Sequence, residues 1–278
     1  MLTIKKILFP VDFSEQCIGA ARYVEAFAGR FDAEVMLLHV AADGEQVLAR
    51  ELQPARQIQL NAFLADEFKY FTTNRQCVTG DPASEIVRMA RSWNPDLVMM
   101  PSHGMGFFRR LLLGSVTAKV LHDLDCPVWT GVHAEKAPPL ERIACTRVLC
   151  AVNLSERSSS VLEWAAALAR EYDAHLGIVH AIPSVEASAA AQFLDQEYVE
   201  DLEAVAKDAI VGLQLAAQTD AEVLVNRGEI SKVVHCATKE FVADLLVIGR
   251  QSRTGLAGHL PHSAYGILRE SQCPVISI

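Results

Sequence analysis

The sequence lacks the cysteine patterns that build disulfide frameworks and zinc sites. Its seven cysteines are scattered along 278 residues, and no two form a C-x-x-C pair. Most of them lie in apolar surroundings. They therefore indicate reduced core thiols of a cytoplasmic protein, and they argue against a secreted, disulfide-bonded domain or a structural metal centre.

Long apolar runs and basic clusters are also lacking. No apolar segment reaches the roughly 18–20 residues needed to cross a bilayer, and the first residues show no secretory signal. The net charge is −9, and Arg109-Arg110 is only a local basic pair. We therefore expect a cytoplasmic protein that neither spans a membrane nor binds nucleic acid.

Familiar catalytic patterns are absent as well. No Walker A motif, carboxylate pair, Ser-His-Asp set or His/Cys cluster is apparent from the spacing of residues. His39 and His180 occupy matching places at the ends of two predicted strands. Their repetition favours a shared structural hydrogen bond over a metal site.

An internal repeat is the strongest positive feature. I-L-F-P-V-D-F-S-E at residues 7–15 aligns with V-L-C-A-V-N-L-S-E at 148–156, an offset of 141. Farther along, D-L-V-M-M at 96–100 aligns with D-L-L-V-I at 244–248 (offset 148), and C-P-V at 126–128 with C-P-V at 273–275 (offset 147). Small changes of offset are typical of loop insertions in a duplicated domain, and 278 residues suit two domains.

Each copy alternates short apolar runs with helical periodicity, which predicts an α/β fold with a parallel, doubly wound sheet. Pro138-Pro139 marks a linker at 134–142, so we predict domains at residues 1–136 and 143–278. Ser14 and Asp81-Pro82 are predicted helix starts. In the first copy we predict strands at 5–11, 34–40, 75–79, 97–101 and 128–133, and helices at 15–31, 45–71, 83–93 and 115–124.

The residues after the fourth predicted strand suit an anion. In open α/β sheets, ligands bind at the carboxyl ends of the strands. There the chain passes through three glycines to a helix start at Ser115. Glycine lets backbone N–H groups approach a phosphate, and a helix N-terminus adds unpaired N–H groups and its dipole.

This stretch resembles the G-x-x-G-x9-G-[ST] motif of the universal stress protein family, with Pro101, Gly104, Gly114 and Ser115 in the motif positions. The resemblance extends over nearly the whole chain, once in each half. It implies two Rossmann-like domains of the adenine nucleotide alpha hydrolase type, with five strands in the order 3-2-1-4-5. It also implies ATP, with or without Mg²⁺, held by the first half. The candidate binding residues are Pro10, Val11, Asp12, Val40, Met100, Pro101, His103, Gly104, Arg109, Gly114, Ser115 and Val116.

Departures from the family pattern are concentrated in the second half. Pro101 replaces the first motif glycine, which removes one N–H donor. Asn153 and Ala181 replace Asp12 and Val40, and the glycine before the last helix is replaced. Counting from Gly249 puts His262-Ser263 in the Gly-Ser position. Counting back from Cys273 puts Pro261-His262 there, and we prefer this count because helices tolerate single-residue insertions worse than loops do.

The resemblance predicts an ATP-binding regulatory protein of the stress response. From its place in the loop, His103 could contact phosphate, assist hydrolysis or simply order the loop, and Arg109 could neutralise phosphates or be a solvated arginine that flanks the helix. Two alternatives stay open: a slow ATPase or adenylyl-transfer enzyme, and a nucleotide-free scaffold or apolar-ligand-binding protein. The last strands of both copies are apolar, so we expect them to pair with each other inside the chain. We also expect a homodimer.

Overall fold

The described residues form one continuous sheet. The computed structural model describes residues 2–42, 46–103, 113–131, 134–183, 196–250 and 262–278. Their strands lie in the order β3-β2-β1-β4-β5-β10-β9-β6-β7-β8. Within each half the neighbouring strands are parallel and follow the order 3-2-1-4-5. The predicted doubly wound fold and strand order are therefore confirmed.

Strands and helices alternate along the chain in both halves. The first half contains β1 (Lys6–Val11), α1 (Glu15–Phe31), β2 (Glu34–Ala41), α2 (Gln46–Ala62), β3 (Thr73–Thr79), α3 (Pro82–Trp93), β4 (Leu97–Pro101), α4 (Ser115–Asp123) and β5 (Val128–Gly131). The second contains β6 (Arg147–Ala151), α5 (Ser158–Tyr172), β7 (His175–Ile182), α6 (Gln196–Ala217), β8 (Glu222–Arg227), α7 (Ile230–Glu240), β9 (Leu245–Ile248), α8 (His262–Glu270) and β10 (Val275–Ser277).

Most helix ends follow the capping residues in the sequence. The Ser14 hydroxyl accepts the Cys17 N–H at the start of α1, and the Asp81 carboxylate accepts the Ser84 N–H before Pro82 in α3. The predicted helix at 45–71 was too long, because α2 ends at Ala62. Leu64 then takes a left-handed conformation with φ 53°, which a helix cannot contain.

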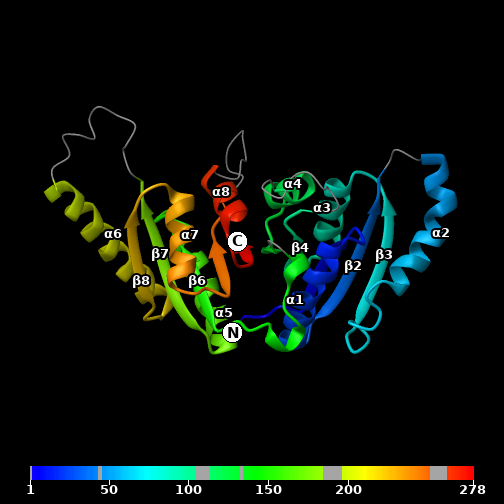
Figure 1. The fold of residues 1–278 in the computed structure, drawn as a ribbon, viewed down its shortest axis with the longest axis horizontal. Helices are drawn as coiled ribbons and strands as arrows, with labels where there is room; N and C mark the ends of the chain where they lie inside the picture. Colours follow the sequence, from blue (N-terminus) through cyan, green and yellow to red (C-terminus); the bar gives the residue numbers. More distant parts are fainter. Residues whose placement is uncertain (1, 43–45, 104–112, 132–133, 184–195, 251–261) are drawn as a thin grey trace.

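Helices cover both faces of the sheet (Figure 1). One face is covered by α3, α4, α7 and α8, and their apolar residues form a single cluster that runs across both halves. On the other face, α1 lies over the first half and α5 and α6 lie over the second. Successive residues of β1 show the alternation: Leu8 joins the first cluster, and Ile7 and Phe9 join the second.

The last strands of the two halves join in the middle of the sheet. β5 and β10 are antiparallel, with Thr130 opposite Val275 and Trp129 opposite Ile276, and all four are fully buried. The Thr130 hydroxyl donates to the Val275 carbonyl at 3.3 Å. Between the halves, two short 3-10 turns at Ala134–Lys136 and Leu140–Arg142 make the connection. The pairing covers the two apolar edges, as the sequence predicted.

Candidate functional site

Most candidate residues lie at one end of the first half's strands. Pro10 and Val11 end β1, Val40 is next to last in β2, and Met100 and Pro101 end β4. Asp12 follows β1, His103 follows β4, and Gly114, Ser115 and Val116 form the start of α4. Gly104 and Arg109 lie outside the described residues. The carboxyl ends of β1, β2 and β4 thus meet the N-terminus of α4, the place where doubly wound sheets bind ligands.

The turn after β1 holds the Asp12 carboxylate firmly. Its Oδ1 accepts the Ser14 N–H at 3.1 Å, the Ser14 hydroxyl at 2.5 Å and the Cys17 thiol at 3.1 Å. Burial, together with the charge of Asp12, raises the pKa of Cys17 to about 12, so the thiol stays protonated and can donate. The carboxylate therefore has a fixed position at the edge of the site.

A histidine fastens β2 to the end of β1. The His39 Nδ1–H donates to the Val11 carbonyl at 2.9 Å, and its ring packs against Phe13 with centroids 4.4 Å apart. Burial lowers the pKa of His39, which favours the neutral ring. His180 makes the same 2.9 Å bond to the Val152 carbonyl. The prediction of a shared structural hydrogen bond is confirmed.

The entrance of α4 requires glycine. Gly114 is the N-cap of α4, and its N–H donates to the Ser102 carbonyl at 2.8 Å, so this amide is engaged by the loop itself. A Cβ at Gly114 would lie 3.2 Å from the Ser102 carbonyl oxygen and 3.3 Å from the His103 Cα. These are backbone atoms that cannot rotate away. The groups at this entrance that remain free of the Gly114 bond are the later N–H groups of α4 and the exposed Ser115, a combination that suits an anion.

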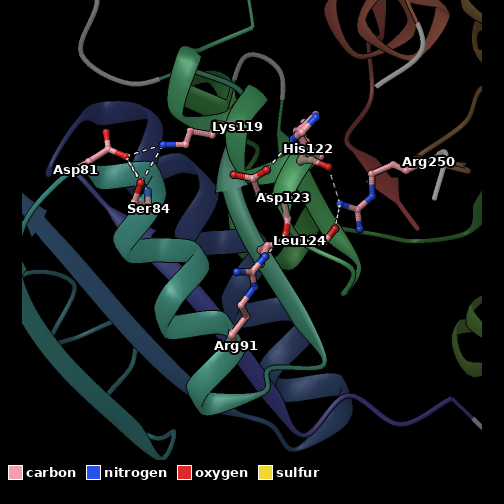
Figure 2. A network of polar contacts seen from close by, with 9 residues as sticks. Asp81, Ser84, Arg91, Lys119, His122, Asp123, Leu124 and Arg250 are labelled. Atoms are coloured by element: carbon pink, nitrogen blue, oxygen red, sulfur yellow. Dashed lines mark hydrogen bonds and ion pairs between the residues drawn. The ribbon is translucent and has the colours of Figure 1, made fainter. Parts of the chain in front are cut away.

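Polar contacts tie α4 to its neighbour α3 (Figure 2). The Lys119 ammonium lies 2.9 Å from both the Asp81 carboxylate and the Ser84 hydroxyl. At the other end of the helix, Arg91 donates to the Asp123 carbonyl at 3.2 Å. Thr117 also donates to the Pro101 carbonyl at 3.2 Å. Helix α4 is thus held along its length.

An arginine from the second half completes this support. Arg250, two residues after the end of β9, donates to the Leu121 and Leu124 carbonyls at 2.9 and 2.8 Å (Figure 2), and also to the Cys126 carbonyl at 2.5 Å. A cation at a helix C-terminus satisfies carbonyls that the helix leaves unpaired. Burial lowers the pKa of Arg250 to about 10, so it remains charged at neutral pH. Sequence reasoning missed this residue, because nothing local to Gly249-Arg250 indicates a partner 124 to 129 positions away.

Comparison with known proteins agrees with this geometry. The model of the universal stress protein family matches residues 3–130 and 145–278. The chain belongs to the universal stress protein family. Universal stress protein MJ0531 of Methanocaldococcus jannaschii is 32% identical over 136 residues, which cover 45% of this chain and 79% of that protein. MJ0577 of the same organism is 31% identical over 150 residues, covering 45% and 92%.

A solved universal stress protein from Archaeoglobus fulgidus shares the whole architecture. It aligns with a TM-score of 0.73 over 98% of this chain and 97% of its own length, at 22% sequence identity. Such a match shows a common fold for the complete tandem chain. The two Methanocaldococcus proteins, in contrast, are similar to about half of it.

The second universal stress protein copy repeats the turn but changes its chemistry. The Asn153 Oδ1 accepts the Ser155 N–H and the Ser158 hydroxyl, both at 3.1 Å, as Asp12 does from Ser14 and Cys17. Helices α4 and α8 both have nine residues, and α8 begins at His262. The ends of the two helices, Asp123 and Glu270, lie 147 positions apart, as Cys126 and Cys273 do, and this offset supports the count that sets Pro261-His262 against Gly114-Ser115. The carboxylate and the entrance glycine are therefore both replaced in this half.

Two further properties concern metals and membranes. Within the described ranges, no group of three or more His, Cys, Asp or Glu side chains could hold a metal ion. None of the helices in those ranges is both long and apolar enough to cross a membrane.

Proposed function

We propose that the first half binds ATP, and that the protein acts as a regulatory, ATP-binding protein of the stress response. The observation that carries the proposal is the meeting of Asp12 with the Gly114-Ser115 entrance of α4 at the carboxyl edge of β1 and β4. A fixed carboxylate suits the N–H and O–H donors of adenosine, and a helix N-terminus suits phosphates.

The remaining candidate residues fit the same ligand. Val40, Met100 and Val116 bring apolar side chains to this edge of the sheet. Gly114 leaves room where any Cβ would press on the backbone of Ser102 and His103. Asp12 is the acid through which an accompanying Mg²⁺ would be held. Among the candidates, Gly104 belongs to the proposal on the family motif, and Arg109 on its charge, which could neutralise phosphates.

Calorimetric titration of the full chain with ATP tests the proposal. We expect one site per chain, and we expect Gly114→Val to weaken binding more than tenfold because the loop between Ser102 and α4 must shift. Gly212→Val is the matched control, since a Cβ at Gly212 meets no atom within 4 Å. Parent-like affinity in Gly114→Val, or equal losses in both variants, would remove this loop from the site.

The assembly and domain division are also proposals. We propose domains at residues 1–136 and 143–278, which the family matches at 3–130 and 145–278 support. We further propose a homodimer of the 30.4 kDa chain. Light scattering coupled to size exclusion measures the mass directly, and a monomer across the accessible concentration range would contradict the dimer.

A further inference from the structure

A cavity of about 240 Å³ opens at the carboxyl ends of β6, β7 and β9 in the second half. Apolar side chains from the sheet and from α5, α7 and α8 line it, among them Val179, Ile248, Val234 and Ile267. All four are buried. Ligand sites commonly pair such an apolar wall with a few polar groups.

Among the described residues, the polar groups that line this cavity are cationic or neutral. Asn153, Arg157, Ser158, His180 and Arg250 contribute to it, and no acidic residue is among the described residues that line it. The acids closest in sequence, Glu156 and Glu229, are not part of the lining, and Glu229 pairs with Lys232 at 2.8 Å.

The corresponding place in the first half carries the opposite charge. At the offset of 141, Asn153 aligns with Asp12 and Arg157 aligns with Gln16. The second half has thus lost an anion and gained a cation at the same end of the same fold. Such a change turns a preference for hydrogen-bond donors into a preference for an anion.

The two arginines have different roles. The guanidinium of Arg250 is turned to the first half, where it donates to three carbonyls at the end of α4. Arg157, an exposed residue at the N-cap of α5, donates to the Arg250 carbonyl at 3.0 Å. Arg157 is therefore the cation at the mouth of the cavity.

We propose that this cavity is a second ligand site, which binds a small organic anion with a compact apolar body. The apolar body packs against Val179, Ile248 and Val234, and the anion pairs with Arg157. A nucleoside triphosphate is not the ligand, because the acid of the first half is replaced here. In addition, proline, which has no N–H, stands at position 261 where Gly114 precedes α4.

Three ligands of one shape and different charge test the proposal on the full chain. Benzoate, benzamide and benzylamine are titrated while the methyl signals of Val179, Val234 and Ile248 are followed by NMR. We expect benzoate to shift these signals and to bind at least about tenfold more tightly than benzamide, as one charge-assisted contact implies. Val11 and Val40, at the equivalent edge of the first half, should stay unshifted.

Two variants locate the anion. Arg157→Gln should abolish the preference for benzoate over benzamide, and Arg170→Gln, farther along the same helix, should keep it. Val234→Phe fills the cavity and should abolish binding of both ligands. If the Val234→Phe variant fails to fold, the Arg157→Gln variant still tests the proposal, because the Arg157 side chain is exposed and its replacement should leave the fold intact.

The proposal is overturned by any of three results. The first is that none of the three ligands shifts the methyl signals of the cavity. The second is that benzylamine binds as tightly as benzoate. The third is that ATP shifts the same methyl signals at a lower concentration than benzoate does. These outcomes are independent of ATP binding by the first half, which is read from the signals of that half.

Discussion

The turns after β1 and β6 have the same backbone and carry different charges. Phe13 and Leu154 both take left-handed conformations, with φ 62° and 56°, and Asp12 and Asn153 accept bonds from matching neighbours. His39 and His180 fasten both turns with 2.9 Å bonds. An aspartate or an asparagine oxygen satisfies the turn equally well. Because either side chain satisfies the turn, the charge at this position could change without loss of the fold, and the two copies could bind different ligands.

The ends of β4 and β9 differ in a second way. Ser102, after β4, aligns with Arg250, two residues after β9, at the offset of 148. Both are buried, and their N–H groups donate to matching carbonyls, Ser102 to Gly131 and Arg250 to Ile278. The Ser102 hydroxyl stays within its own loop, 2.9 Å from the His103 Nδ1, and Arg250 crosses to the other half. At these two strand ends the support between the halves is therefore one-sided, with Arg250 of the second half holding α4 of the first. On the other face of the sheet, Arg30 of α1 donates to the Glu171 carbonyl of α5.

The largest expected effect comes from removing what joins the copies. Deleting residues 274–278 removes β10, whose Val275 and Ile276 are fully buried between β5 and β9. Each such side chain stabilises the fold by roughly 1.5–3 kcal/mol, and the apolar edge of β5 would lie open. We expect aggregates or new oligomers by light scattering. A soluble truncated protein with the parent's mass would show that the β5–β10 pairing is dispensable.

Next in size is the one-sided support. Arg250→Met removes three hydrogen bonds from the end of α4 and leaves buried carbonyls unpaired. We expect the free energy of unfolding to fall by about 3 kcal/mol, measured by urea denaturation followed by circular dichroism. Ser102→Ala, the matched change in the first half, should cost less than about 1 kcal/mol. Equal losses in the two variants would mean that the support is symmetric after all.

Sequence patterns predicted the elements well and the long-range contacts poorly. The repeat, the caps at Ser14 and Asp81 and the strand order depend on local patterns and a family motif, and the structure confirms them. The end of α2 was missed because Leu64 is an ordinary helix former placed by tertiary packing in a left-handed conformation. The cross-chain role of Arg250 and the cavity beside it arise only when distant segments meet.

The charge difference between the turns gives a smaller effect, seen in binding and not in folding. Asp12→Asn copies the second half, and its amide oxygen can accept the same bonds that Asn153 accepts. We expect stability to change by less than about 1 kcal/mol, and ATP affinity to fall by about 1.5–3 kcal/mol for one lost charge-assisted bond. Calorimetry measures both quantities. If Asn153→Asp gained ATP binding in the second half, the charge alone would explain the difference.

The smallest expected effect is the pH dependence that His39 gives to the first half. Burial lowers the pKa of His39 below its ordinary value near 6.5, so the unfolded chain takes up the proton at a pH where the folded chain still excludes it. Above that ordinary value both states are neutral and the histidine causes no change. As the pH falls through it, the free energy of unfolding should decrease. His39→Gln, which can still donate to the Val11 carbonyl, should show a shallower decrease between pH 7 and 5 in urea titrations. A slope unchanged from the parent, or steeper, would mean that other groups set the acid sensitivity of the fold.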